Sequence, residues 1–364
     1  MLKSKLDKKR ISILVSSYFS ICGGAEKQID MLVDNLNKMG YDITIITRNK
    51  KNKNDEIKYL KNKKVFSVYV GEGKLSKYRY VFKALKYLLK LPYQNTIISS
   101  QYGSNTIIAV LYSLIHKTNV IARGSGREIE IIEKNTIKKM FLNILSKKIN
   151  YVVAINKRLE NKLKSVLGLK NIDKIKYISN SVNLGKRVDI NKNKNIICVS
   201  RIEKIKGIDI LLEVWTLLEN RGVNIPLVIV GSGSEKKYLR EKYSFLKNVA
   251  WKDETANIEQ YLDKARCMIS TSRYEGVSNS ILEAMSKGVP VIATQNYGNM
   301  ELIENDITGI LTTFKTEDIM QSILNLYNDS SKLSYIANNS VDYINKERSV
   351  EYMIKKYVEI IEKV

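Results

Sequence analysis

The fold is decided by one stretch in the second half of the chain, residues 270–293, which has the sequence STSRYEGVSNSILEAMSKGVPVIA. A buried strand ends at its start, and a polar loop follows that carries Glu275-Gly276. A helix then begins near Ser278–Ser280, because Ser and Asn are favourable helix N-caps. The run Gly288-Val-Pro290 ends this helix and leads into a second buried strand. The stretch therefore predicts a strand–helix–strand unit of a parallel sheet.

The same alternation of short β-branched runs and longer amphipathic stretches continues in both directions along the chain. It predicts an α/β fold in which helices cover both faces of parallel sheets. Expected helices include Glu26–Met39, Ile208–Asn220 and Ser280–Lys287. The expected strands are Ile11–Val15, Tyr41–Thr47, Val65–Val70, Thr96–Ser99, Asn119–Ala122, Tyr151–Ala154, Ile175–Ile178, Ile196–Val199, Leu227–Val230, Val249–Trp251, Cys267–Ser270, Val289–Ala293 and Gly309–Leu311.

The length of 364 residues is too great for one ordinary core and suits two domains. The polar stretch Lys186–Asn195 has no core pattern and is the best candidate for a linker. We therefore expect two Rossmann-like, doubly wound domains over residues 1–185 and 186–340, which face each other across a cleft at the carboxyl ends of their strands. Residues 341–364 are expected to end in a C-terminal helix that packs on one of the two domains, with the N-terminal domain as a candidate.

The charge of the chain is concentrated in its first half. The whole sequence has 61 Lys and Arg against 37 Asp and Glu, and residues 1–185 hold 36 of the basic residues but only 13 of the acidic ones. This asymmetry predicts an anionic partner for that half, such as a membrane surface, an acidic acceptor or nucleic acid. Two stretches, Lys77–Lys90 and Ile137–Lys148, mix bulky apolar residues with lysines. Each is compatible with a helix on an anionic bilayer and with a core helix that has a solvated lysine face.

Composition also bears on where the protein acts. No stretch approaches the roughly 20 uncharged apolar residues that span a bilayer. The widely spaced cysteines Cys22, Cys198 and Cys267 show no metal-binding pattern and are typical of reduced core thiols. The basic start before Ile11–Ile21 is compatible with a secretion signal, but the following glycine turn and amphipathic helix favour a first buried strand. We expect a cytoplasmic protein, attached peripherally to the inner face of the cytoplasmic membrane.

Charged and glycine-containing loops follow the predicted strands of the second half. Arg201 and Lys206 follow one strand, where Arg offers a bidentate fork to phosphate and Lys a movable charge, although an ordinary solvated loop is an alternative. Gly231 makes a turn after the next strand, which plain helix entry also explains. The backbone N–H groups at the start of the helix near residue 278 form an anion site. About one turn into that helix, Glu283 can accept hydrogen bonds from sugar hydroxyls.

In this order, the segments resemble glycosyltransferase family four, whose members have the GT-B fold, use nucleotide sugars and retain the anomeric configuration. The family's Glu-x7-Glu pattern is matched by Glu275 and Glu283, and its Arg and Lys-Gly pair by Arg201 and Lys206-Gly207. Further resemblances are Gly23-Gly24-Ala25-Glu26 in the early glycine loop, Ile178–Asn183 before the linker and Asn299–Gly309 after the next strand.

The resemblance implies a role for each matched position. Arg201 and Lys206 would neutralise the donor diphosphate, Glu283 would bind the ribose and Glu275 would contact the donor sugar. Backbone groups would complete the cradle, from Gly276, Val277, Ser278, Asn279 and Ser280, with Gly231 alongside and Gly23 and Gly24 approaching from the other domain. No Asp-x-Asp occurs in the chain, so we expect no metal and no cofactor beyond the nucleotide-diphosphate sugar. The implied activity is a retaining, hexosyltransferase-type transfer to a saccharide acceptor, lipid-linked as in surface polysaccharide or glycolipid assembly.

The sequence departs from the family pattern on the acceptor side. Relatives carry a histidine near the acceptor, whereas His116, the single histidine here, falls at the end of a predicted helix and is interpreted as a surface or packing residue. Arg123, at a strand end, is either a contact for an anionic or lipid-phosphate acceptor or a plain loop arginine. Ser181 stands where relatives have glycine.

Other classes of protein fit the sequence less well. The chain has no recognisable nucleic-acid-binding module, and its best ligand motifs lie in the near-neutral half, so no nucleic-acid partner is expected. The spacing around Gly23-Gly24 is not the Gly-x-Gly-x-x-Gly of a Rossmann oxidoreductase. A sugar-nucleotide epimerase or phosphorylase of the same architecture, or a non-catalytic partner subunit, stays open as an alternative.

Overall fold

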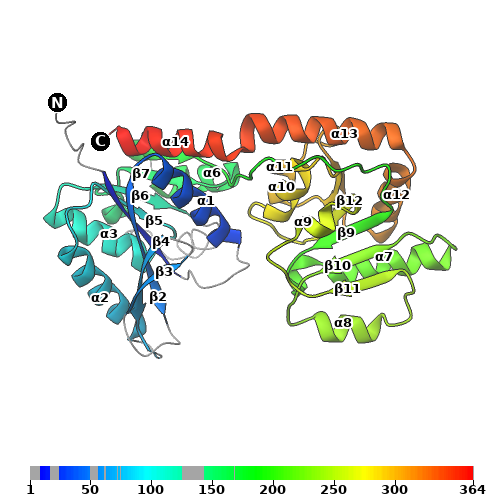
Figure 1. Ribbon diagram of the computed structural model, residues 1–364, viewed down its shortest axis with the longest axis horizontal. Helices are drawn as coiled ribbons and strands as arrows, with labels where there is room; N and C mark the ends of the chain where they lie inside the picture. Colours follow the sequence, from blue (N-terminus) through cyan, green and yellow to red (C-terminus); the bar gives the residue numbers. More distant parts are fainter. Residues whose placement is uncertain are drawn as a thin grey trace. The chain divides into compact units, whose positions relative to one another are not determined.

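The computed structural model describes residues 9–16, 24–49, 56–60, 63–71, 73, 75–124, 143–167 and 169–363 (Figure 1). The chain divides into two compact units, Met1–Ser179 together with Met353–Val364, and Asn180–Tyr352. Each unit is built on a parallel sheet, which confirms the predicted α/β fold class of two Rossmann-like domains.

The first unit contains an eight-stranded sheet with the order β3-β4-β2-β1-β5-β6-β7-β8. Neighbouring strands are parallel, except that β3 runs antiparallel to β4 and forms the sheet edge. Strand β3 was not predicted from the sequence, because its five residues EIKYL lie in a stretch rich in lysine and asparagine. The strands are β1 (Arg10–Val15), β2 (Asp42–Asn49), β3 (Glu56–Leu60), β4 (Lys63–Tyr69), β5 (Thr96–Ser99), β6 (Asn119–Arg123), β7 (Tyr151–Ala154) and β8 (Ile175–Tyr177).

Both faces of this sheet are covered, as a parallel sheet requires. Leu14 and Ile97 belong to a core that also holds residues of α2 and α3. The next residues along the strands, such as Ile13 and Ile98, point to the opposite face and are equally buried. The helices of this unit include α1 (Gly24–Lys38), α2 (Ser76–Lys90), α3 (Ser104–Ile115), α6 (Lys157–Leu167) and most of α14 (Val350–Glu362).

The C-terminal helix α14 contacts the first unit along its length from Met353 onward. The Asn119 side chain donates a hydrogen bond to the Ile360 carbonyl over 3.1 Å. Lys9 and Tyr41 both contact the Glu362 carboxylate. These contacts tie the last helix to the first residue of β6 and to the residues that directly precede β1 and β2.

The second unit contains a six-stranded, wholly parallel sheet with the order β11-β10-β9-β12-β13-β14. After β9 the chain builds outward on one side and then returns to the other side of β9 with β12. The gap between β9 and β12 is therefore a topological switch point, where such sheets bind ligands at the carboxyl ends of the strands. The strands are β9 (Asn195–Val199), β10 (Leu227–Val230), β11 (Val249–Lys252), β12 (Ala265–Ser270), β13 (Val291–Thr294) and β14 (Ile310–Thr312).

Helices of the second unit pack on both faces of this sheet and bury two apolar cores, the larger of which contains Trp215. The indole of Trp215 is fully buried and donates to the Ile225 carbonyl over 2.9 Å. The helices are α7 (Ile208–Asn220), α8 (Lys236–Lys242), α9 (Glu259–Leu262), α10 (Asn279–Ser286), α11 (Tyr297–Leu302), α12 (Thr316–Tyr327) and α13 (Ser330–Tyr343).

The stretch 186–195, for which the sequence suggested a linker, lies inside the second unit. Ile190 is buried in the core of that unit, and the Val188 N–H donates to the Lys287 carbonyl. The chain instead passes between the units at residues 179–180 and 352–353. Polar composition concealed this packing, because one isoleucine and backbone hydrogen bonds are enough to hold the segment.

Among the helices in the described part of the chain, none combines the length and apolar character that a membrane crossing requires.

Candidate functional site

Loops at the carboxyl ends of β9, β10 and β12 are held together at the switch point by close backbone contacts. Gly207 has a φ of +66°, and a Cβ on it would lie 2.1 Å from the Thr271 carbonyl oxygen. The Thr271 hydroxyl donates to the Gly207 carbonyl over 2.8 Å. A Cβ on Gly231 would lie 1.9 Å from the Ser200 carbonyl oxygen, so only glycine fits there. The glycines thus let the loop after β9 touch both neighbouring loops.

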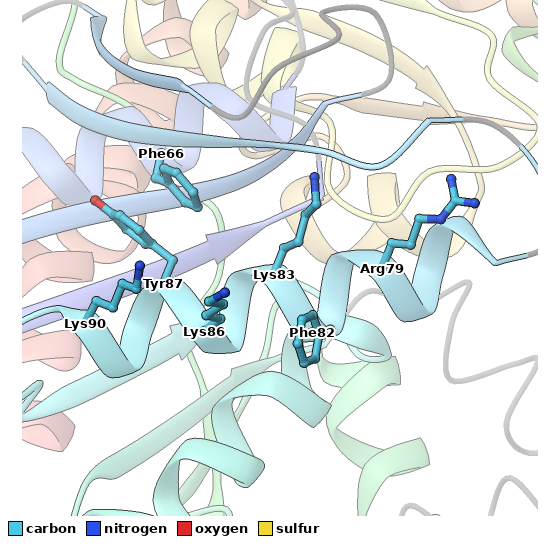
Figure 2. A pocket seen from close by; sticks show the side chains of 7 residues that line it. All are labelled: Phe66, Arg79, Phe82, Lys83, Lys86, Tyr87 and Lys90. Carbon is cyan, nitrogen blue, oxygen red and sulfur yellow. The ribbon is translucent and has the colours of Figure 1, made fainter.

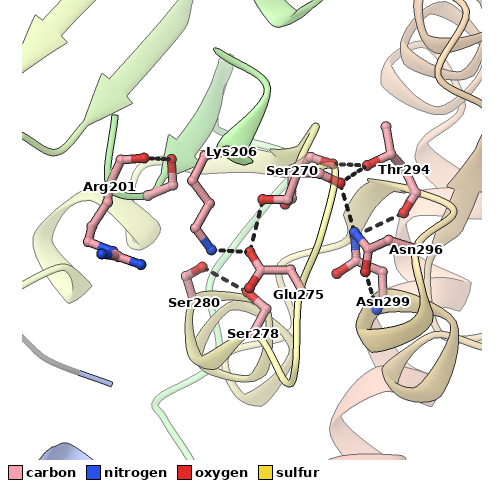
Figure 3. A network of polar contacts seen from close by, with 11 residues as sticks. Arg201, Lys206, Ser270, Glu275, Ser278, Ser280, Thr294, Asn296 and Asn299 are labelled. Carbon is pink, nitrogen blue, oxygen red and sulfur yellow. Dashed lines mark hydrogen bonds and ion pairs between the residues drawn. The ribbon is translucent and has the colours of Figure 1, made fainter. Parts of the chain in front are cut away.

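Lys206 and Glu275 form an ion pair inside this cluster of loops. Lys206 Nζ lies 2.5 Å from Glu275 Oε1, and the two side chains are only 14% and 12% exposed. The Ser272 hydroxyl donates to the same carboxylate oxygen over 2.9 Å. The structure therefore brings together two of the three predicted catalytic residues, one from the loop after β9 and one from the loop after β12 (Figure 3).

A second set of contacts, which the sequence analysis did not anticipate, supports the loop that carries Glu275. The Ser272 carbonyl accepts hydrogen bonds from Asn296 Nδ2 and from the Thr294 hydroxyl, each over 2.8 Å (Figure 3). Asn296 also caps α11, because its side chain accepts from the Asn299 N–H. A Cβ on Gly298 would lie 2.6 Å from the Glu275 carbonyl oxygen. Polar residues directly after β13 were the available signal, since β13 is the neighbour of β12 and its carboxyl end lies at the same edge of the sheet.

Arg201, the third predicted catalytic residue, lies in the loop after β9, the same loop that carries Lys206. Its side chain is exposed, and within the described residues it forms no ion pair with a carboxylate. The loop after β9 thus carries one exposed arginine and one half-buried lysine.

The predicted anion cradle is the start of α10, which lies next to Glu275. Ser278 is the buried N-cap residue, and its hydroxyl lies 3.2 Å from that of Ser280. A Cβ on Gly276 would meet no atom within 4 Å, so the loop between Glu275 and Val277 borders open space. Asn279 accepts a hydrogen bond from Asn180 over 2.9 Å, which links α10 to the start of the unit. Half-buried Glu283 follows within α10.

The arrangement offers fixed positive charge at a helix N-terminus beside a carboxylate. Lys206 has three N–H donors and uses one of them on Glu275, so the ammonium can also contact an anion. A helix N-terminus adds partial positive charge and backbone donors. In the described residues, no group of three or more His, Cys, Asp or Glu side chains is placed to hold a metal ion.

The remaining predicted residues lie elsewhere or outside the described part. Gly23 falls outside the described residues, and Gly24 begins α1 in the first unit, so a ligand contact for either stays a prediction. His116 packs against the rings of Tyr93 and Tyr112 at the end of α3, which confirms a packing role.

Arg123 has a partner within the first unit. It hydrogen-bonds to Tyr357 of α14, whose pKa is raised by burial, and the nearby guanidinium opposes that rise. The contact gives Arg123 a structural role that the sequence did not suggest, since it joins the end of β6 to α14, and a contact with an acceptor stays a prediction.

Two cysteines in the second unit are buried and reduced. Burial raises the pKa of both thiols, Cys198 and Cys267, to about 12. Thiols with such pKa values are protonated near neutral pH and therefore poor nucleophiles.

Comparisons with known proteins show which proteins this chain resembles. Residues 183–342 match the family described as Glycosyl transferases group 1, a match that lies within the second unit. The amylovoran biosynthesis glycosyltransferase AmsD of Erwinia amylovora is 26% identical over 369 residues, which cover 97% of this chain and 99% of that protein. The poly(ribitol-phosphate) alpha-N-acetylglucosaminyltransferase of Staphylococcus aureus is 27% identical over 220 residues, 58% of this chain and 44% of that protein.

Among solved structures, Anabaena HepE in complex with UDP and glucose superposes with a TM-score of 0.78. The two chains are 17% identical, and the match covers 98% of this chain and 100% of HepE. At that identity the likeness shows a shared fold. The matched family, the relatives and the architecture together support assigning this chain to the GT-B superfamily of glycosyltransferases.

Proposed function

We propose that the protein transfers a sugar from a nucleotide-diphosphate sugar to a saccharide acceptor. The observation that carries this proposal is the Lys206–Glu275 ion pair beside the start of α10, at the switch point of the second sheet. The cation and the helix N-terminus suit the negative charge of a diphosphate, and the neighbouring carboxylate suits the hydroxyl groups of the sugar that is joined to it. HepE, whose fold this chain shares, was solved with UDP and glucose.

In the proposed reaction, the bond between the sugar C1 and the diphosphate oxygen breaks, and the acceptor hydroxyl forms the new bond to C1. Negative charge develops on the departing diphosphate, where Lys206, Arg201 and the N–H groups of residues 276–280 would meet it. Fixed charges and dipoles of this kind lower the barrier because they need no reorganisation during the reaction. Glu275 would contact the donor sugar, and Glu283 the ribose.

Two finer features belong to the same proposal. The hydroxyl of the acceptor would attack from the face that the diphosphate leaves, and would pass its proton to that diphosphate, so that the configuration at C1 is retained. The support is the Glu-x7-Glu resemblance of Glu275 and Glu283. The reaction would need no divalent metal, because two cationic side chains and a helix N-terminus supply the positive charge.

We further propose a lipid-linked acceptor at the inner face of the cytoplasmic membrane, as in surface polysaccharide assembly. The excess of basic residues in positions 1–185 suits an anionic membrane surface. AmsD, similar to this chain along nearly its whole length, is named for amylovoran biosynthesis.

The experiment is a thermal-shift screen of the purified chain against UDP-, GDP-, ADP-, dTDP- and CMP-sugars, followed by a product assay with the best ligand. A ligand that binds only the folded state raises the melting temperature. We expect one nucleotide sugar to raise it, and turnover to continue after EDTA treatment. Turnover that requires inorganic phosphate would identify a phosphorylase, and an isomerised donor without glycoside product an epimerase. Binding without any turnover would indicate a non-catalytic subunit.

A further inference from the structure

The helix α2 of the first unit has two apolar faces, and one of them is exposed. Its inner face is formed by Tyr80, Ala84 and Leu88, which are buried in the core. The outer face carries Leu75, Tyr78, Phe82 and Leu89, with 61%, 74%, 69% and 43% of each residue exposed. We call these four residues the exposed row; Leu75 caps the helix and the others lie within it.

For this stretch the sequence left two interpretations open, a helix on an anionic bilayer and a core helix with a solvated lysine face. Spacings of three, four and seven residues place the members of the exposed row in one line along the helix. A solvated lysine face would not contain such a line of leucine and aromatic side chains. Contiguous exposed apolar surface of this kind marks an interaction site.

A basic row runs directly beside the exposed row. It consists of Arg79, Lys83, Lys86 and Lys90, which follow one another at intervals of four, three and four residues and therefore lie in one line along the helix. No acidic residue occurs in α2. Within the described residues, no carboxylate pairs with Lys86 or Lys90, whose side chains are exposed.

The basic row lines a groove of about 400 Å³ between α2 and β4. Its floor is the stacked pair of Phe66 and Tyr87, with ring centroids 3.5 Å apart and planes inclined by 13° (Figure 2). Lys83 Nζ donates to the Tyr69 carbonyl over 3.0 Å, which holds this lysine along the groove. The lining comprises four cations, three aromatic residues and no acid: Phe66, Arg79, Phe82, Lys83, Lys86, Tyr87 and Lys90.

We propose that α2 docks the protein on an anionic bilayer, with the basic row and its groove on lipid phosphates and the exposed row in the boundary between head groups and acyl chains. An amphipathic helix with Lys and Arg beside Leu and aromatic residues lies in the interface in this way. The net positive charge of residues 1–185 complements an anionic leaflet. A nucleic acid or anionic polymer would engage the cations but leave Leu75 and Leu89 in water. This inference rests on the proposed membrane attachment and assigns it to one helix.

The test uses flotation of the full chain with phosphatidylglycerol vesicles and with phosphatidylcholine vesicles at 0.15 M salt. Reversal of two charges in Lys86→Glu/Lys90→Glu is expected to weaken binding to the anionic vesicles about tenfold or more. Tyr78→Ser/Phe82→Ser is expected to weaken it as well, because apolar insertion is lost. These residues are exposed, so the variants should keep the melting temperature of the wild-type chain.

Helix α8 of the second unit offers a matched control. It has the exposed aromatic residue Tyr238 and the exposed cations Lys237 and Arg240, but no continuous apolar row. Lys237→Glu/Arg240→Glu changes the net charge by the same amount and should leave vesicle binding unchanged. Equal losses from the α2 and α8 variants would show that net charge alone drives binding and would overturn the proposal.

A second readout reports insertion directly. In Phe82→Trp, indole emission is expected to shift to shorter wavelength on addition of anionic vesicles and to stay unchanged with heparin. A shift with heparin and none with vesicles would identify a polyanion site instead and would overturn the proposal. Donor-sugar binding, followed by thermal shift without vesicles, separates this inference from the proposed function. The α2 variants should keep the rise in melting temperature that the donor sugar causes. A wild-type chain whose melting temperature no donor sugar raises would refute the proposed function alone.

Discussion

The ammonium of Lys206 lies 2.5 Å from a carboxylate oxygen of Glu275, although 69 residues separate them in the chain. The contact joins the loops after β9 and β12, the two strands that flank the switch point of the second sheet. A half-buried pair of this kind keeps a cation at the position where a ligand phosphate would arrive, without leaving either charge uncompensated in the unliganded protein.

Gly298→Ala is expected to destabilise the loop that carries Glu275. The new Cβ would lie 2.6 Å from the Glu275 carbonyl oxygen and 2.8 Å from the Glu275 Cβ, so the backbone must shift. We expect a loss of about 1–3 kcal/mol in the free energy of unfolding, measured by urea denaturation, together with weaker donor binding.

Gly276→Ala is the matched comparison, because its Cβ would meet no atom within 4 Å. Its free energy of unfolding should change by less than about 0.5 kcal/mol. Donor affinity should nevertheless fall, since the open space beside Gly276 is where the ligand is proposed to approach. Equal destabilisation by both substitutions would contradict the packing described here.

Asn296→Ala should weaken both the loop and the short helix α11. The change removes the hydrogen bond from Asn296 Nδ2 to the Ser272 carbonyl and the N-cap contact to the Asn299 N–H. Loss of such a cap costs about 1 kcal/mol, and the buried hydrogen bond adds about another. Urea denaturation of Asn296→Ala against Asn325→Ala, an exposed position on α12, measures the difference. A wild-type free energy of unfolding in Asn296→Ala would show that the network is dispensable.

The buried thiols predict a fall in stability at alkaline pH. In the folded chain the pKa of Cys198 and Cys267 is about 12, whereas the ordinary value is 9.0. Above about pH 9 the unfolded state loses these protons while the folded state keeps them. The free energy of unfolding contributed by each thiol therefore falls by about 1.4 kcal/mol per pH unit between the two pKa values.

Urea denaturation at pH 8, 9 and 10 measures this fall. A Cys198→Ala/Cys267→Ala variant should show a shallower decline than the parent chain. Identical slopes in the two proteins would assign the alkaline loss to other groups, such as the buried tyrosines.

Much of the fold could be predicted because strands of a parallel sheet are buried on both faces and therefore appear as continuous apolar runs. Thr96–Ser99, Tyr151–Ala154 and Leu227–Val230 have the predicted bounds. The edge strand β3 was missed because an edge strand needs no apolar run. The packing of residues 186–195 was missed because backbone hydrogen bonds hold a polar segment as well as side chains do.

The candidate site was predictable only where a residue type has its own chemistry. Lys206 was found because a cation after a strand points to an anionic ligand, and Glu275 because Glu275 and Glu283 match the Glu-x7-Glu pattern of the resembled family. Asn296 and Gly298 were missed because they act through another loop, and contacts between distant loops leave no local pattern. For α2 the sequence left a bilayer-facing helix and a core helix open, because periodicity shows an apolar face without telling whether the core covers it.

The most direct test of the site is the kcat/KM for donor turnover in Lys206→Ala, measured with the nucleotide sugar that stabilises the chain best. Lys204→Ala, an exposed lysine of the same short helical turn, serves as the control. If Lys206 meets the charge of the departing diphosphate, kcat/KM falls by about 10²–10³ in Lys206→Ala and stays at the wild-type value in Lys204→Ala. Wild-type turnover in Lys206→Ala would contradict the proposed role of the Lys206–Glu275 pair.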